Sequence, residues 1–524
     1  MKNLRRASQI VFFLFFVYLF IQTEYKGRNE LGLPVRLFLD FDPLIALSAL
    51  LSSHAVRAVF LFSLITVALT IFLGRFFCGW VCPLGAINTA IGALRMRSLK
   101  PNRSEGRYPN LRPVKYYLLV FVLVAAIFGW NAAGFLDPIS LTIRSLAIGY
   151  NPAINKIARS ALEAGVGLNI PLVSPGLDAL YTKMTGTVLS FNQPMFRQSL
   201  FIGLIFTAIL GLNFLAPRFW CRYLCPLGAL LGLIGWKQLA ARVSNDKDKC
   251  ISCRKCVVAC QGDATPFPAG EWASRECLVC YNCREVCPAS AISIPAGARN
   301  TGDGNVNLER RWLLASGVGA LLAVPAIATG IQRKRTDPSL IRPPGALPEQ
   351  EFVRRCVKCG ECMKVCLTNG LHPTFAEAGL EGLWTPILVP RLGYCEYNCN
   401  LCSQVCPTGA IRPVTVEEKQ KIHIGLAFVD KNRCLPYAFG RQCIVCEEHC
   451  PTPEKAITFI EEPALDERGA AVILKKPVVN PDLCIGCGIC ETKCPVLDLP
   501  AIRVTAANES RSEENRLFLN RRTE

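Results

Sequence analysis

The sequence predicts an α-helical membrane domain, built of two repeated hairpins, followed by small α+β domains rich in cysteine. Three observations support this fold class: 51% of the 524 residues are hydrophobic and only 19% charged, apolar runs are concentrated in the first half, and 28 cysteines fall into regular groups. The low charged fraction argues against a wholly soluble or disordered chain. A net charge of +18 in so apolar a chain is typical of basic loops that orient membrane proteins, so we expect membrane lipid and not nucleic acid as its partner.

Four apolar runs, at residues 7–23, 58–74, 116–135 and 200–216, are long enough to cross a bilayer. The first has a basic start and is followed by Glu24 instead of a small-residue cleavage site, so it predicts an uncleaved span. The loop at 95–115 holds seven basic residues and one acid, Glu105. The positive-inside rule therefore places this loop, the N-terminus and the segment after residue 216 in the cytoplasm. The alternative is that the second and fourth runs are buried helices of a soluble domain.

The second and fourth runs end in matching strings, Arg75-Phe-Phe-Cys-Gly-Trp-Val-Cys-Pro-Leu-Gly-Ala and Arg218-Phe-Trp-Cys-Arg-Tyr-Leu-Cys-Pro-Leu-Gly-Ala. The first and third runs are each followed by an Asp-Pro pair, Asp42-Pro43 and Asp137-Pro138. Two hairpins of one design are expected, and such repeats commonly place a functional site at their interface.

The matching strings contain two Cys-x3-Cys-Pro motifs. If the hairpins pack side by side, Cys78, Cys82, Cys221 and Cys225 converge at the inner membrane surface. There they would hold a metal or small cluster, or act as a dithiol switch. The alternative is that they are packed, inert thiols.

A fifth apolar segment, at 312–330, follows Arg310-Arg311 and precedes Arg333-Lys334-Arg335. A twin-arginine pair before a mildly apolar run resembles a Tat export signal, which predicts an outward crossing. The alternative is a helix on the cytoplasmic face.

The other 24 cysteines form six sets of four. Four sets have the spacing C-x2-C-x2-C-x3-C, and two are variants with a longer first gap. The regular sets are Cys250, Cys253, Cys256, Cys260; Cys277, Cys280, Cys283, Cys287; Cys356, Cys359, Cys362, Cys366; and Cys484, Cys487, Cys490, Cys494; the variants are Cys395, Cys399, Cys402, Cys406 and Cys434, Cys443, Cys446, Cys450.

This spacing is that of bacterial ferredoxins, in which three thiolates wrap one [4Fe–4S] cluster and the fourth ligates the neighbouring cluster. Six [4Fe–4S] clusters are therefore expected. Zinc sets usually have two cysteine pairs with a longer spacer, so zinc is the weaker interpretation. In the first two sets, Cys287 completes one cluster and Cys260 the other. The sequence leaves the pairing among the last four sets open.

Residues 1–295 resemble the NapH family, the membrane component of a quinol dehydrogenase, through the four runs, the Cys-x3-Cys-Pro motifs and the Cys250–Cys287 sets. The membrane part of the NosR family is similar. Residues 305–500 resemble the NapG/MauM family of Tat-exported four-cluster ferredoxins, through Arg310-Arg311 and the two variant sets. The resemblance implies a natural fusion of two partners that are usually separate.

Five segments are expected. These are a membrane domain (1–240), a two-cluster domain (241–300), a linker with the fifth apolar segment (301–335), a four-cluster domain (336–504) and a charged tail (505–524). The resemblance places the chain in the bacterial inner membrane, with the two-cluster domain in the cytoplasm and the four-cluster domain in the periplasm.

The leading functional hypothesis is an electron conduit. It would take electrons from membrane quinol and deliver them to a periplasmic cytochrome or terminal reductase, as a component of an oxidoreductase of quinol dehydrogenase type. The alternatives are a redox-sensing or maturation factor for a metalloenzyme, and a wire of a larger complex with all clusters cytoplasmic. No Walker loop or dinucleotide fingerprint indicates a soluble-substrate enzyme.

Quinol oxidation also releases protons, so its site needs a proton acceptor at the edge of the apolar layer. Asp42 and Asp137 occupy matching places in the repeat, and His54 is the only histidine in the membrane half. We expect a quinol site among these three residues. The alternative is that each Asp caps the helix begun by its following proline, with His54 at the surface.

Overall fold

A computed structural model describes residues 1–54, 60–98, 108, 111–167, 174–237, 243–264, 267, 272–294, 309–327, 337–465 and 471–512. Most of the basic loop, the glycines of the expected linker (Gly297, Gly302, Gly304) and the last part of the tail lie outside these residues.

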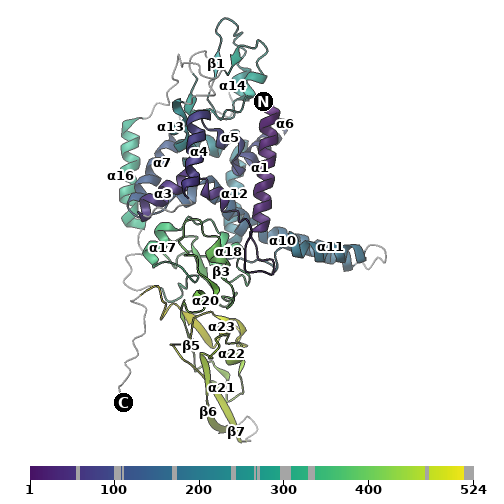
Figure 1. The fold of residues 1–524 in the computed structure, drawn as a ribbon, viewed down its shortest axis with the longest axis vertical. Coiled ribbons are helices and arrows are strands. Elements are labelled where there is room, and N and C mark those ends of the chain that lie inside the picture. Colours follow the sequence, from purple (N-terminus) through teal and green to yellow (C-terminus); the bar gives the residue numbers. More distant parts are fainter. Residues whose placement is uncertain are drawn as a thin grey trace.

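A layer of helices forms the middle of the molecule (Figure 1). Its core contains buried residues from both halves of the repeat, including Phe16, Leu84, Val122 and Leu231. The helices of this layer are α1 (Lys2–Gln22), α2 (Leu37–Asp40), α3 (Pro43–Ser53), α4 (Leu61–Leu73), α5 (Phe76–Trp80), α6 (Pro83–Ser98), α7 (Val114–Ile127), α8 (Ala133–Leu136), α9 (Pro138–Arg144), η3 (Ser145–Tyr150), α12 (Ser199–Gly211), η4 (Leu212–Phe214), η5 (Trp220–Leu224), α13 (Pro226–Ile234) and η6 (Gly235–Lys237).

The helices in this layer are shorter than the four apolar runs suggested. In the described part of the chain, α1 alone is long and apolar enough to span a membrane, while α3, α4, the first part of α6, α7 and α12 with η4 are apolar but shorter. Gly74, the last residue of the second run, has φ 72° and ends α4 after 13 residues. A 13-residue helix such as α4 is about 20 Å long. The expectation of four full spans is therefore not confirmed.

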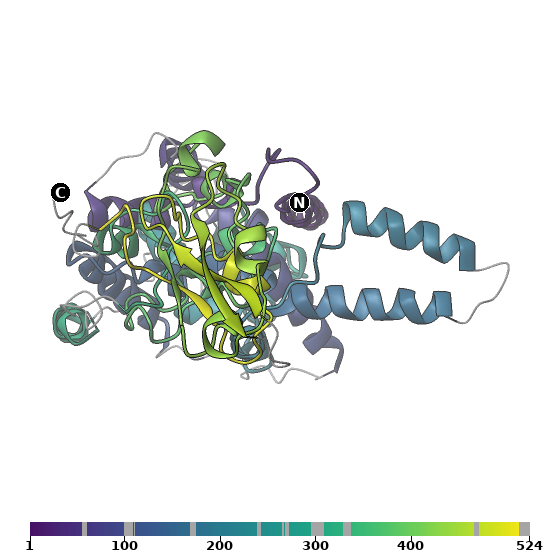
Figure 2. The same ribbon diagram turned by 90° about the horizontal axis from the view of Figure 1, so that it is seen from below.

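Two helices, α10 (Asn151–Gly167) and α11 (Ser174–Thr187), form a hairpin that projects sideways from the layer (Figure 2). They pack on each other, with Leu177 of α11 meeting Gly165 of α10.

A small cysteine-rich domain, residues 243–294, sits at one end of the helical layer, beside the N-terminus of α1 (Figure 1). Its two short strands pair antiparallel, Ser244 with Ser293 and Asn245 with Ile292. Its elements are β1 (Ser244–Asn245), α14 (Lys255–Ala259), η7 (Ser274–Glu276), α15 (Asn282–Glu285) and β2 (Ile292–Ser293).

A large cysteine-rich domain, residues 337–512, sits at the opposite end of the layer and is elongated away from it (Figure 1). It holds three two-stranded antiparallel sheets, β3–β4, β5–β8 and β6–β7. Its elements are α17 (Glu349–Arg355), α18 (Glu361–Lys364), β3 (Leu371–Pro373), β4 (Pro386–Leu388), α19 (Leu401–Gln404), α20 (Val416–Lys419), β5 (Leu426–Val429), α21 (Leu435–Ala438), α22 (Val445–Glu448), β6 (Ile457–Leu465), β7 (Ala471–Val479), α23 (Ile489–Lys493) and β8 (Ile502–Thr505).

The large domain extends past residue 504, so the expectation of a frayed tail from 505 is wrong for its first part. Thr505 pairs with Leu426 in the β5–β8 sheet. Arg511 forms ion pairs with Glu349 and Glu509, at 2.8 and 2.5 Å. Arg511 is held in place because Glu349 lies on another part of the domain, in α17.

Helix α16 (Arg310–Ile327) lies beside α7 and runs along the layer from the end that carries the small domain to the end that carries the large domain (Figure 1). The apolar segment after Arg310-Arg311 is thus a helix packed on the layer. Its last predicted residues, 328–330, lie outside the described residues.

Candidate iron–sulfur centres and buried carboxyl pair

Five small cavities are each lined by four cysteines, three from one motif and one from another. Four of them lie in the large domain and one in the small domain. The quartets are Cys260, Cys277, Cys280, Cys283; Cys356, Cys359, Cys362, Cys406; Cys366, Cys395, Cys399, Cys402; Cys434, Cys443, Cys446, Cys494; and Cys450, Cys484, Cys487, Cys490.

These quartets settle the pairing that the sequence left open. The Cys356 and Cys395 sets exchange their last cysteines, Cys366 and Cys406. The Cys434 and Cys484 sets likewise exchange Cys450 and Cys494. In the small domain, Cys256 lies close to Cys253 and Cys287, as expected for a sixth quartet with Cys250. The donor set fits iron–sulfur ligation, in which paired motifs share their fourth thiolates.

The four regular motifs also share a backbone conformation around their second cysteine. The residues on each side of it have positive φ in all four loops: Ser252 and Arg254, Val279 and Tyr281, Lys358 and Gly360, and Gly486 and Gly488. Successive turns of this kind direct backbone N–H groups into a concave, anion-binding surface. The thiols also accept N–H bonds, for example Cys260 from Ala264 at 3.2 Å. The loops are therefore suited to a negatively charged cluster.

The quartets of the large domain form a row. The Cys356 quartet adjoins the helical layer, since Val357 and Cys359 belong to the layer's core. The Cys395 quartet exchanges a cysteine with it and is tied to the Cys484 motif by a Cys395 N–H to Cys487 O bond of 2.8 Å. The Cys434 quartet follows, near α21 and α22 at the distal end of the domain (Figure 1). The row therefore leads away from the helices.

Both domains dock on the layer through a glycine. A Cβ on Gly79 would lie 2.3 Å from the Leu278 carbonyl oxygen, and one on Gly134 would lie 2.3 Å from that of Val357. Leu278 and Val357 occupy the same motif position, directly after the first cysteine of their sets. Neither glycine was singled out from the sequence, because a close approach to a distant segment leaves no local pattern.

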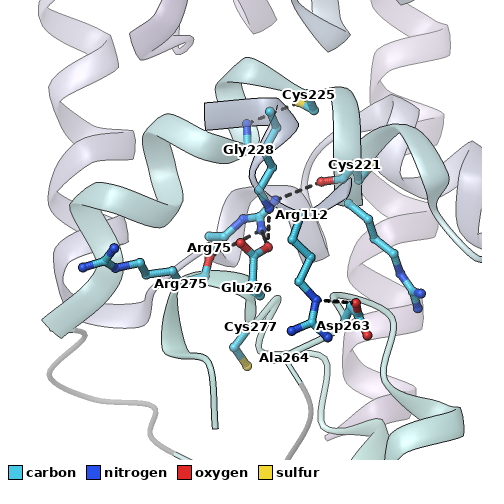
Figure 3. Close-up of polar contacts among 12 residues, drawn as sticks. Arg75, Arg112, Cys221, Cys225, Gly228, Asp263, Ala264, Arg275, Glu276 and Cys277 are labelled. Carbon is cyan, nitrogen blue, oxygen red and sulfur yellow. Dashed lines mark hydrogen bonds and ion pairs between the residues drawn. The ribbon is translucent and has the colours of Figure 1, made fainter. Parts of the chain in front are cut away.

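A buried carboxylate anchors the small domain. Glu276 accepts a hydrogen bond from Tyr116 Oη at 2.8 Å and pairs with Lys115. It also pairs with Arg75, at 3.1 Å (Figure 3). Burial alone would raise the pKa of Glu276, but the charges of Lys115 and Arg75 outweigh it and hold that pKa below its usual range. Glu276 is therefore an anion in an ion-pair network, which sequence reasoning missed because its partners lie far away in the chain.

The four thiols of the Cys-x3-Cys-Pro motifs come together beside the small domain, as the repeat predicted. Two of them accept hydrogen bonds, Cys225 Sγ from the N–H of Gly228 at 3.3 Å and Cys221 Sγ from Asn88 Nδ2 at 3.7 Å. In the described parts of the chain, no group of three or more His, Cys, Asp or Glu side chains is arranged to hold a single metal ion. All four thiols are buried: Cys78, Cys82, Cys221 and Cys225.

Asp42 and Asp137 meet at the other end of the layer, and each caps its helix as the alternative interpretation expected. Asp42 Oδ1 accepts from the N–H of Leu44 at 2.8 Å, and Asp137 Oδ2 accepts from that of Ser140 at 2.7 Å. Both residues are fully buried, and the second oxygen of each carboxyl, Asp42 Oδ2 and Asp137 Oδ1, has no hydrogen-bond partner among the described residues. Burial raises the pKa of both carboxyls, and the Asp137 charge raises that of Asp42 further.

The pair adjoins the large domain through Arg144. Its guanidinium donates to Gly134 O at 2.8 Å and to Lys358 O, beside Cys359, at 3.1 Å, and it lies in the field of Asp137. His54 does not join the pair, since it is exposed at the opposite end of α3 from Asp42.

The chain matches sequence models of two families, each described as a 4Fe-4S binding domain. One matches residues 57–101 and again 198–243, which are the two repeats with the Cys-x3-Cys-Pro motifs, and the other matches residues 476–500. No solved structure matches the chain.

Curated relatives include ferredoxin-type proteins. Ferredoxin-type protein NapH of Escherichia coli is 28% identical over 42% of this chain and 59% of its own length. Ferredoxin-type protein NapG of the same organism is 36% identical over 26% of this chain and 60% of its own length. Methylamine utilization ferredoxin-type protein MauM of Methylophilus methylotrophus is 38% identical over 19% of this chain and 44% of its own length.

The chain thus spans about half the length of each of these relatives. It is similar to the ferredoxin-type proteins NapH, NapG and MauM and carries matches to 4Fe-4S binding domains.

Proposed function

We propose that this protein is a membrane-bound conduit that oxidises quinol and passes electrons through six [4Fe–4S] clusters to a periplasmic cytochrome or reductase. The observation that carries the proposal is the placement of the two cysteine-rich domains at opposite ends of one apolar helical layer (Figure 1). A soluble electron carrier has no need for such a separator.

Exposed apolar side chains support a membrane environment for the layer. On α4, Leu61, Leu64 and Phe72 are each more than half exposed, and on α12 the same holds for Leu200 and Leu204. Exposed apolar patches of this kind mark contact with lipid or with other proteins. The basic residues Arg112 and Lys115 lie at the small-domain end, which the positive-inside rule assigns to the cytoplasm. The proposed topology then places the large domain in the periplasm, with α16 crossing beside α7.

The carboxyl pair supports a quinol site at the periplasmic edge of the layer. Quinol oxidation releases two protons with two electrons, so the site needs a group that accepts protons as well as a centre that accepts electrons. The clusters supply one-electron transfer. Burial and the Asp137 charge raise the pKa of Asp42, which favours a retained proton there, and Arg144 joins the pair to the loop of the Cys356 quartet. The pair can thus accept and release a proton next to the first quartet of the row.

The far end of the row supports electron delivery to a soluble partner. Phe439 and Ile444 are exposed beside the Cys434 quartet, at 59% and 43%. Apolar side chains next to the outermost redox centre suit brief docking of an electron acceptor.

The test is quinol-dependent bleaching of the cluster absorbance in anaerobically purified protein, reconstituted in lipid nanodiscs. We expect rapid reduction by quinol. Asp42→Asn and Asp137→Asn should slow it about 10²–10⁴-fold, the usual contribution of a positioned proton acceptor, while His54→Gln, at the exposed end of α3, serves as the matched control. Absence of reduction with intact clusters would overturn quinol oxidation and favour the redox-sensing or maturation role.

Topology has its own test, a reporter fused after Glu524. A periplasmic signal is expected, and Arg310→Lys with Arg311→Lys should trap the large domain inside. A cytoplasmic reporter in the unaltered protein would instead favour a wire with all clusters on the cytoplasmic side.

A further inference from the structure

The four cysteines of the two Cys-x3-Cys-Pro motifs form a compact site that none of the six ferredoxin quartets uses. We call Cys78, Cys82, Cys221 and Cys225 the four-thiol site. Cys78, Cys82 and Cys225 belong to the core of the helical layer together with Cys280 of the small domain, and Cys221 is buried near them. A set of inert packing thiols would need no charged neighbours, so the surroundings of the site are informative.

Two arginines cross between the repeat halves around this site. Arg75 Nη2 donates to the Cys221 carbonyl at 3.3 Å, and Arg218 Nη1 donates to the Cys78 carbonyl at 3.0 Å. Arg75 and Arg218 are the equivalent first residues of the two matching strings. Each half thus supplies a buried guanidinium to the cysteine loop of the other half.

Glycines make room for both crossing contacts. A Cβ on Gly228 would lie 2.5 Å from Arg75 Nη2, and one on Gly85 would lie 2.7 Å from the Cys78 carbonyl oxygen that accepts from Arg218. Gly85 and Gly228 are again equivalent residues, from the Pro-Leu-Gly that follows each motif. Figure 3 shows Arg75 between Glu276, Cys221 and Gly228. The site is therefore built with approximate two-fold symmetry around two fixed positive charges.

The buried charges at this end do not balance if the thiols are neutral. Arg75, Lys115 and Arg218 are each at most 2% exposed, and Glu276 is the carboxylate that pairs with the first two. In the described part of the chain, Arg218 donates to the neutral acceptors Thr89 Oγ1 and Cys78 O. Three cations and one anion leave two positive charges in excess, which is costly in an apolar core.

The nearby cations Arg5 and Arg222 are left out of this balance because their hydrogen bonds go to residues of the small domain. Arg222 donates to the carbonyls of Cys260 and Gln261, at 2.6 and 2.8 Å, and Arg5 donates to Gln261 Oε1 at 3.1 Å. These contacts surround the Cys260 quartet instead.

We propose that Cys78, Cys82, Cys221 and Cys225 together ligate a seventh iron–sulfur cluster, of the 4Fe–4S class. Four thiolates around an oxidised cluster core carry about two net negative charges, which offset the excess of two buried positive charges. The match of a 4Fe-4S binding family to both repeats, residues 57–101 and 198–243, agrees with this assignment. A single metal ion fits less well, since the described side chains include no group arranged for one. The described cysteines of the ferredoxin quartets are likewise not arranged around a single ion.

The test is iron content and ⁵⁷Fe Mössbauer absorption of the full chain, purified anaerobically. The unaltered protein should contain about 28 iron atoms, and the variant with all four cysteines changed to serine about 24, a loss of about one-seventh of the absorption. Loss of iron down to about 24, with the ferredoxin signals intact, supports the seventh cluster. Unchanged iron content, or copper or zinc in its place, overturns it.

A second variant keeps the proposal falsifiable if the quadruple variant does not accumulate. Arg218→Gln removes one compensating charge and leaves all four thiols, whereas Arg218→Lys keeps the charge. We expect Arg218→Gln to lower the occupancy of the cluster, seen as a loss of its electron paramagnetic resonance signal on reduction, and Arg218→Lys to restore part of it. Equal signals in both variants and the unaltered protein would overturn the assignment. Neither readout depends on quinol oxidation, so the proposed function can fail while this inference stands.

Discussion

The two cysteine-rich domains dock on opposite ends of the helical layer through different interactions. At the small-domain end, docking depends on ionised groups, with Glu276 held by Arg75, Lys115 and Tyr116. At the large-domain end, Lys364 forms a longer ion pair with Glu24, at 3.7 Å, and Lys358 Nζ donates to a neutral carbonyl, that of Asn131, at 3.1 Å. In addition, burial raises the pKa of the neighbouring carboxyls Asp42 and Asp137 there. Each end also has a close contact between a glycine of the layer and a carbonyl of the docked domain, at Gly79 and at Gly134.

The repeat brings equivalent residues of the two halves together at both ends, whereas the charged residues around them differ between the ends. Equivalent residues of the two halves meet at both ends: four thiols at one, two carboxyls at the other. The small-domain end is fixed by permanent charges and is suited to holding a cluster domain. The large-domain end retains a titratable pair and is suited to proton transfer.

The largest effect is expected from Glu276→Gln, which leaves the buried charges of Arg75 and Lys115 without a counter-charge. Removing one partner of a buried ion pair typically costs about 3–5 kcal/mol. Hydrogen exchange should show the small domain opening while the large domain stays protected. The control is Glu285→Gln, which removes the exposed partner of Lys2. Equal protection in Glu276→Gln and the control would show that the ion pairs do not hold the small domain.

Gly134→Val and Gly79→Val test the shared docking contact. A side chain at either position would overlap the carbonyl of Val357 or Leu278, and overpacking costs about 1–3 kcal/mol. Each variant should loosen only its own domain, measured by hydrogen exchange in the loops that contain Val357 and Leu278. Gly92→Val is the control, because nothing lies within 4 Å of an added Cβ there. A variant that loosened both domains equally would contradict independent docking.

The carboxyl pair predicts a pH dependence that is specific to the large-domain end. Because the folded pKa of Asp42 is raised above its unfolded value, the pair's contribution to stability is fully present below the unfolded pKa. It is lost as the pH rises from there through the folded pKa, by about 1.4 kcal/mol for each pH unit. Asp42→Asn retains an acceptor for the helix cap and should reduce this loss, leaving only the part that comes from Asp137. Thermal unfolding across a pH series is the measurement, and an unchanged pH profile in the variant would contradict a proton retained by Asp42.

The smallest effects are expected from single hydrogen bonds that cross each interface. Trp80 Nε1 donates to Val279 O at 3.1 Å, and Ser52 Oγ donates to Arg354 O at 2.7 Å. Trp80→Phe and Ser52→Ala should each cost about 0.5–1.5 kcal/mol, the net value of one such bond. Denaturant unfolding in detergent would measure both. A much larger loss in Ser52→Ala would show that the large-domain end depends on polar contacts more than the ion-pair comparison indicates.

Cysteine spacing alone gave the correct pairing for the Cys260 quartet, because its two sets are adjacent in the chain. For the last four sets it could not, since the long segments between Cys366 and Cys395 and between Cys406 and Cys434 allow several arrangements. Hydropathy located the helices, but α4, α7 and α12 are shorter than the runs that predicted them. Hydropathy does not register backbone conformation, such as the φ of 72° at Gly74 that ends α4.

The sequence by itself determined the chemistry of this protein: the ferredoxin spacing, the repeated Cys-x3-Cys-Pro motifs and the paired Asp-Pro turns follow from local rules of ligation and helix capping. The tertiary structure decided which groups share a site, namely the carboxyl pair, the exchanged arginines and the row of quartets. The physical reason is that electrostatic and packing energies depend on distance in space, and segments more than a hundred residues apart in the chain become neighbours only in the folded protein.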